Sequence, residues 1–229
     1  MKVKIYSFGS QDAKTLLLLP GTCCHWKSNF GHVIPLLMQD YHVLCVSYDG
    51  FDETERTEFP TMLEETEKIE KYIREQCGGR IHGAYGCSLG GSFVGLLAPR
   101  HIVAVSPGEV PWNDAEKARM QALNDKDVSI DYAFMTLVEK FMRHGQENVP
   151  DYMISGSRGD FSGVGDIHFF YSADEVLYGA LPDFETACQR AHVPHTAFAW
   201  PGMVHCYCML PYFKEAKEDF GKITAILRK

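Results

Sequence analysis

The stretch Gly86-Cys87-Ser88-Leu89-Gly90 indicates the fold more directly than any other part of the chain, because its serine lies two residues from a glycine on each side. That spacing is typical of a tight turn between a strand and a helix, the nucleophile elbow, in which the serine is forced outward. Glycine is needed at both flanking positions because a side chain there would strike the neighbouring backbone. The pattern predicts a nucleophilic serine at position 88.

The residues on either side of the elbow have the pattern that such a turn requires. Residues 80–85 are expected to form the strand that enters the turn, and residues 88–99 carry apolar side chains at helical spacing after it. Strand, turn and helix therefore follow one another in the order that the motif needs.

Short apolar runs alternate with longer segments of helical period along the rest of the chain. Residues 16–19 (LLLL) and 41–48 (YHVLCVSY) read as buried central strands. This alternation predicts an α/β fold with a doubly wound, mostly parallel sheet. Further strands are expected at 101–106, 166–171 and 195–200, and further helices at 61–77, at 182–191 and from Pro211 onward.

Residues 107–165 interrupt this alternation. Two helices are expected there, at 113–124 and 129–144, and the second has apolar residues on more than one face. Such a helix can pack on the core, or it can be a lid whose extra apolar face meets a substrate, and the two interpretations are compatible. We expect a single domain over residues 1–229 with this segment as a helical lid insertion.

The composition narrows the class of protein. The chain has 229 residues, of which 45% are hydrophobic, so it can bury a large core. Its formal net charge of -8 offers no basic field for nucleic acid or an anionic membrane surface. No apolar run reaches the length of a membrane span or a signal peptide, so we expect a cytoplasmic protein with reduced cysteines. The oligomeric state is left open.

A serine hydroxyl is a weak nucleophile at neutral pH unless a base takes its proton, so Ser88 requires a histidine, and the histidine requires a carboxylate. Of the ten histidines, His205 lies in the short loop between the last expected strand and the last expected helix, where loops face the active edge of a parallel sheet. Asp174 follows the preceding strand and gives the order serine, acid, histidine. Glu175 is the alternative acid, because a shift of one residue in the strand end would exchange the two.

On these residues the chain resembles the α/β-hydrolase superfamily, which includes serine esterases, lipases and thioesterases. The elbow is the most specific match. The stretch Leu19-Pro-Gly-Thr-Cys-Cys-His-Trp26 is similar to the family's loop after an early strand, and Ser172-Ala-Asp174-Glu-Val176 is similar to its acid turn. The resemblance extends from Leu16 to the C-terminal helix.

The resemblance implies an oxyanion hole formed by the backbone N–H groups of Leu89 and Thr22, with Cys23 as the alternative second donor. Cys23, His25 and Trp112 are candidates for lining the pocket, although a solvated loop histidine is equally compatible with position 25. We expect no metal: the cysteines do not have the paired spacing of structural zinc sites, and a metal on His205 would remove the base. No glycine-rich loop matches a nucleotide fingerprint, so no cofactor is expected.

Together these features predict a serine hydrolase that cleaves a carboxylic ester or thioester of a small, partly apolar acyl group through an acyl-enzyme. Two other classes remain open. One is a different reaction on the same scaffold, such as peptide, lactone or carbon–carbon bond cleavage, or a lyase. The other is a ligand-binding module without catalysis.

Overall fold

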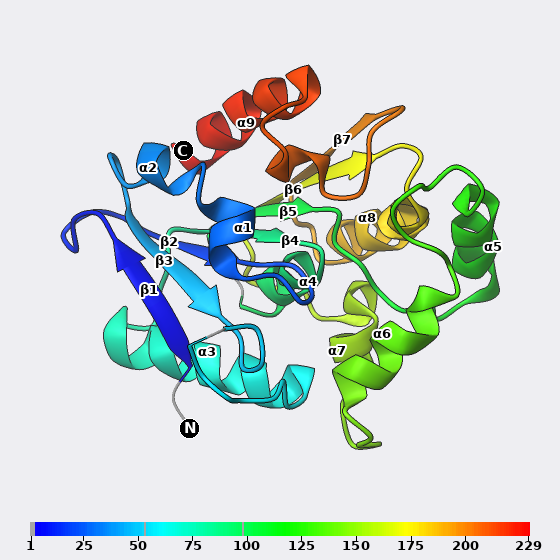
Figure 1. Cartoon of the computed structure of the whole chain (residues 1–229), viewed down its shortest axis with the longest axis horizontal. Helices are drawn as coiled ribbons and strands as arrows, with labels where there is room; N and C mark the ends of the chain where they lie inside the picture. Colours follow the sequence, from blue (N-terminus) through cyan, green and yellow to red (C-terminus); the bar gives the residue numbers. More distant parts are fainter. Residues whose placement is uncertain (1–2, 53, 98) are drawn as a thin grey trace.

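The computed structural model describes residues 3–52, 54–97 and 99–229 (Figure 1). Its centre is a seven-stranded sheet with the order β1-β3-β2-β4-β5-β6-β7. The edge strand β1 is antiparallel to β3, and the other neighbours are parallel. The expected doubly wound, mostly parallel sheet is therefore confirmed. The strands are β1 (Lys4–Phe8), β2 (Thr15–Leu19), β3 (His42–Ser47), β4 (Gly83–Cys87), β5 (His101–Val105), β6 (Asp166–Ser172) and β7 (His195–Trp200).

Helices cover both faces of the sheet (Figure 1). The four leucines of β2 are fully buried, although successive side chains of a strand point to opposite faces of the sheet. Both faces must therefore be covered. Leu17 and Leu19 join one core, and Leu16 and Leu18 join the other. The first core contains α3 (Met62–Gln76), α4 (Leu89–Leu96) and α8 (Leu181–Arg190), and the second contains α1 (Trp26–Phe30), α2 (Ile34–Leu37) and α9 (Lys214–Leu227).

Three element boundaries differ from those expected and bear on the site. Strand β4 starts at Gly83 and ends directly before the elbow serine. Strand β6 runs to Ser172, one residue beyond its expected end. Helix α4 ends at Leu96, short of the expected end at residue 99, and position 98 lies outside the described residues.

The segment 107–165 contains three helices at the side of the sheet where β4 and β5 end: α5 (Asp114–Leu123), α6 (Phe134–Arg143) and α7 (Asp151–Ile154) (Figure 1). Helix α6 begins later than the expected residue 129. The carboxylates of Asp127 and Asp131 accept hydrogen bonds from the N–H groups of residues 129, 130 and 133, which holds the chain in turns before the helix. None of the described helices has the length and apolar character needed to cross a membrane.

Candidate active site

Ser88 occupies the turn between β4 and α4 in a strained conformation. Its φ is 52° and its ψ is -120°, which costs a residue other than glycine ~1–3 kcal/mol. A Cβ added to Gly86 would lie 2.2 Å from the carbonyl oxygen of Gly90, and one added to Gly90 would lie 1.9 Å from the carbonyl oxygen of Leu19. The turn is therefore as tight as the sequence motif predicts, and neither glycine can carry a side chain.

A short side-chain hydrogen bond joins His205 to Glu175. The Nδ1 atom of His205 lies 2.6 Å from Oε2 of Glu175, whose side chain is fully buried. The other carboxylate oxygen, Oε1, accepts hydrogen bonds from the hydroxyl of Ser106 at 2.7 Å and from the N–H of Ser172 at 2.9 Å. Both oxygens are thus partnered, and the imidazole is held with Nε2 turned away from the carboxylate.

Asp174, the acid favoured from the sequence, does not make this contact. Its Oδ2 atom accepts a hydrogen bond from the N–H of Gly202 at 2.6 Å. The physical reason is the extra residue in β6: because the strand continues to Ser172, the turn that follows is shifted by one position, and Glu175 takes the place beside His205. The alternative acid from the sequence is the one that the structure pairs with the histidine.

The end of β5 holds both the elbow and the histidine loop. The N–H of Ser88 donates to the carbonyl of Val105 at 2.9 Å, and the N–H of Cys206 donates to the hydroxyl of Ser106 at 3.1 Å. Ser106 and Cys206 both have left-handed backbones, with φ of 45° and 55°, which are strained for these residues. Val105 and Ser106, which are adjacent at the end of β5, therefore bring the candidate nucleophile and base to the same edge of the sheet.

The Nε2 atom of His205 faces a thiol in this structure. It lies 3.3 Å from Sγ of Cys206, and in the described part of the chain it makes no hydrogen bond with Ser88. Burial lowers the pKa of His205, but Cys206 and the Glu175 carboxylate outweigh this effect and raise that pKa well above 6.5. Burial also raises the pKa of the Cys206 thiol that lies against this nitrogen.

A cavity of about 30 Å³ lies beside Ser88 and is also lined by Thr22 and Leu89. Within the described residues, the backbone N–H groups of Thr22 and Leu89 donate no hydrogen bond, so both are available to an oxyanion. Cys23 does not line this cavity. Much of the remaining wall is apolar and includes Ile130, Phe134, Met135, Val138, Met142 and Leu177.

The carboxyl group of Glu109 also lines this cavity. Its two oxygens accept hydrogen bonds of 2.6 Å from the N–H and the hydroxyl of Ser157. Burial and the neighbouring Glu116 raise the pKa of Glu109 well above its usual value, and burial raises the pKa of Glu116. Oε1 of Glu116 is buried and has no hydrogen-bond partner among the described groups. One proton shared between the carboxyl groups of Glu109 and Glu116 would give this oxygen a hydrogen bond. Burial of the two neighbouring carboxyl groups therefore favours the protonated form of the pair.

His25 and Trp112 do not line the cavity beside Ser88. His25 caps α1, where its Nδ1 accepts a hydrogen bond from the N–H of Lys27 at 3.3 Å. The indole N–H of Trp112 donates to the hydroxyl of Ser157 at 3.1 Å, and about half of this residue is exposed.

Ser106 and Glu109 were not among the residues expected at the site. The sequence does carry a signal for Ser106, because a serine directly after the buried run HIVAV can turn back to a neighbouring strand end. It carries none for Glu109, whose place depends on the path of segment 107–165. All eight cysteines lie in the described residues and are free, and no group of three or more His, Cys, Asp or Glu side chains described here is placed to hold a metal ion.

A parallel sheet with a strained serine at the end of one strand, and a histidine–carboxylate pair at the ends of later strands, defines the class of α/β hydrolases. The sequence model of the alpha/beta hydrolase family matches residues 16–213, and the chain belongs to that family. A comparison with functionally curated proteins gives no match.

Several solved structures share the fold at low sequence identity. EstE1, a thermophilic carboxylesterase cloned from a metagenomic library, superposes with a TM-score of 0.79 at 16% identity, covering 99% of this chain and 84% of its own. An esterase from the bacterial hormone-sensitive lipase family gives 0.76 at 18% identity with the same coverage. An esterase/lipase from an uncultured bacterium gives 0.69 at 16% identity, again with 99% and 84% coverage. These likenesses establish the fold.

Proposed function

We propose that this protein is a serine hydrolase that cleaves carboxylic esters or thioesters of apolar acyl groups through an acyl-enzyme. The observation that carries the proposal is the Glu175–His205 pair, which is tethered to the same strand end as the strained Ser88 turn. A receptor has no physical need for such a pair at the same sheet edge as a strained, half-buried serine. The esterases that share this fold give further support.

In the proposed reaction, Ser88 attacks the substrate carbonyl while Nε2 of His205 takes its proton. Glu175 holds the imidazole tautomer and stabilises the imidazolium. The free N–H groups of Leu89 and Thr22 stabilise the oxyanion, each contributing roughly 2.7–4 kcal/mol to lowering the barrier. His205 then protonates the leaving group, which departs and leaves the acyl group on Ser88. Water, deprotonated by His205, attacks this acyl-enzyme, and His205 returns the proton to Ser88 as the acid is released.

Substrate binding has one local requirement. Nε2 of His205 must exchange its contact with Cys206 for the hydroxyl of Ser88, and catalytic hydrogen bonds often tighten only in the complex.

The cavity beside Ser88 favours an apolar group over a charged one, because much of the wall is hydrocarbon or thioether. Helix α6 supplies that wall through Met135 and Met142, which are flexible enough to repack around a ligand. Phe134, in the cavity wall, is 41% exposed, and Leu137 of the same helix is 57% exposed, so α6 also presents apolar side chains to solvent. We therefore include in the proposal that α6 acts as the lid.

Ser88→Ala is expected to lower kcat for p-nitrophenyl ester hydrolysis by at least about 10³-fold, because the attacking oxygen is lost. A fluorophosphonate probe should label the wild-type protein and leave Ser88→Ala unlabelled. Ser162→Ala, which changes an exposed serine outside the cavity, is the matched control and should react like wild type. Equal labelling of wild type and Ser88→Ala would contradict the proposal, and binding of esters without turnover would favour a ligand-binding module.

The pH dependence follows from the base. Catalysis needs a neutral imidazole, and the pKa of His205 is raised, so kcat/KM should be full at high pH and should fall as the pH drops through a value above about 6.5. The measurement is kcat/KM for one ester between pH 4 and 9. A profile that stays flat down to pH 4 is incompatible with a histidine base.

A further inference from the structure

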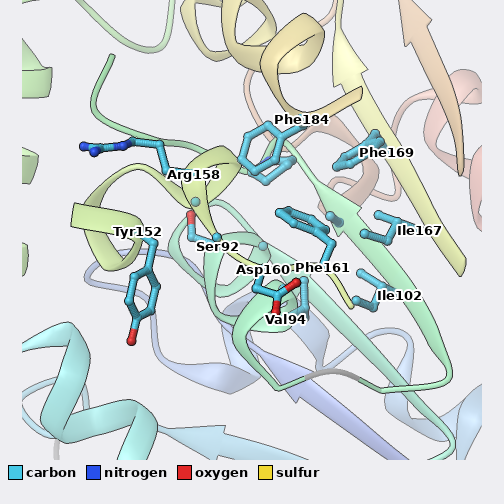
Figure 2. Close-up of a pocket in the computed structure, with 16 residues that line it drawn as sticks. Ser92, Val94, Ile102, Tyr152, Arg158, Asp160, Phe161, Ile167, Phe169 and Phe184 are labelled. Carbon is cyan, nitrogen blue, oxygen red and sulfur yellow. The ribbon is translucent and has the colours of Figure 1, made fainter. Parts of the chain in front are cut away.

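A second cavity, of about 510 Å³, lies along the helix that begins at the nucleophile (Figure 2). Residues of α4, β5, β6 and α8 and the short helical turn Gly156–Arg158 contribute to its walls. Its volume falls within the ~300–1,000 Å³ range of small-molecule sites.

The lining of this cavity is more apolar than polar. Figure 2 shows the rings of Phe161, Phe169 and Phe184 around it, with Ile102 and Ile167 contributed by the strands. The charged side chains of the lining are already engaged elsewhere. The guanidinium of Arg158 points away from these rings and pairs with Asp151 at 2.8 Å, and the exposed carboxylate of Asp160 accepts a hydrogen bond from the N–H of Ser162 at 2.9 Å. The cavity therefore suits a hydrocarbon group and offers no buried partner to an ion.

The two cavities meet at Ser92, which lines both of them. Ser92 lies one helical turn after Ser88, and its N–H donates to the carbonyl of Ser88 at 3.2 Å. Its hydroxyl donates to the carbonyl of Gly108, which lines the smaller cavity. Gly91, Gly95 and Val94 also line the larger cavity, so three of the four α4 residues in its wall are glycine or serine.

In the conformation of this structure, the smaller cavity is too small for more than a short acyl group. Its 30 Å³ has room for about one water molecule, whereas a group longer than acetyl needs several times that space. The larger cavity is the next space along the same helix face. If each methylene is allotted ~30 Å³, as a water molecule occupies in the liquid, the larger cavity can hold an extended chain and still leave room for motion.

We propose that the larger cavity is the acyl-chain site of the enzyme, entered past Ser92 when the Ser92–Gly108 hydrogen bond opens. The preferred substrates are then esters or thioesters of apolar acyl groups of roughly six to ten carbons. The inference rests on the proposed function and names its substrate class. Because burying a methylene favours binding about fourfold, kcat/KM should rise up to fourfold per carbon from acetate to octanoate.

Gly95 provides the test. A Cβ added there meets no atom within 4 Å, so the side chain of Gly95→Leu enters the cavity without striking the backbone. This variant should lower the ratio of kcat/KM for p-nitrophenyl octanoate to that for the acetate by at least tenfold, and Gly95→Ala should lower it less. Gly221→Leu is the matched control: this exposed glycine lies in α9, its added Cβ also meets nothing, and it lines neither cavity.

The outcomes separate the two proposals. A loss of octanoate preference in Gly95→Leu with an unchanged ratio in Gly221→Leu supports the acyl-chain site. Active enzyme whose ratio is the same in wild type and Gly95→Leu overturns it and leaves the hydrolase proposal standing. Failure of the wild-type protein to cleave any ester or thioester of the series overturns both.

Discussion

Glu175→Gln is expected to lower kcat for ester hydrolysis by about 10³- to 10⁴-fold, because an amide cannot hold the imidazole in the correct tautomer or stabilise the imidazolium. The carbonyl oxygen of glutamine can still accept hydrogen bonds from Ser106 and Ser172, so the fold should be retained. Removing the charge that acts on His205 should also lower the pKa of this base. The acid limb of the kcat/KM profile should therefore move to lower pH.

Asp174→Asn is the matched control for this substitution. It removes a carboxylate charge one residue away from Glu175, and its side-chain oxygen can still accept the hydrogen bond from Gly202. We expect kcat within a few-fold of wild type and an unshifted acid limb. Steady-state kinetics on both variants across pH makes the comparison. A large loss in Asp174→Asn with an active Glu175→Gln would assign the acid to Asp174.

Gly90→Ala is expected to cost more than about 4 kcal/mol of unfolding free energy, a large part of the ~5–15 kcal/mol stability of a typical domain. The added Cβ would lie 1.9 Å from the carbonyl oxygen of Leu19 and 2.7 Å from that of Pro20. Both atoms belong to the backbone where β2 ends, so neither can move aside as a flexible side chain could.

Gly95→Ala tests whether the Gly90 effect is local. It lies in the same helix, and its new methyl group meets no atom within 4 Å, so we expect a gain of roughly 0.5–1 kcal/mol from the lower conformational entropy of alanine. Urea unfolding followed by circular dichroism measures both variants. If the unfolding midpoint of Gly90→Ala matched that of wild type, the tight approach between α4 and β2 would be disproved.

Much of the sheet could be predicted because its central strands are continuous apolar runs. Leu16–Leu19 must be buried on both faces, and only a strand covered by helices on both sides achieves this. The edge strand β1 was not predicted, since the run Lys4–Phe8 alternates weakly and is only partly buried. Helix α6 was expected to start earlier, because helical period alone does not reveal that Asp127 and Asp131 bind the backbone ahead of it.

The site was predictable as far as it depends on local motifs and chain order. Ser88 follows from its flanking glycines, and His205 follows from its loop after the last strand. Whether Asp174 or Glu175 contacts this histidine depends on whether β6 ends at residue 171 or 172. Strand propensity does not fix a strand end to within one residue. Glu109 and the cavity along α4 depend on how a segment of irregular pattern folds back on the sheet, which no local rule specifies.

The tether at the end of β5 also has a mechanical consequence. Val105, the last residue of β5, binds the backbone of Ser88, and the next residue, Ser106, binds the histidine loop, so both halves of the candidate site are attached to adjacent residues of the chain. Under the proposed mechanism, a displacement of this strand end would carry the serine and the histidine loop together. The spacing needed for the proposed proton transfer would then depend little on where the strand end lies relative to the rest of the sheet.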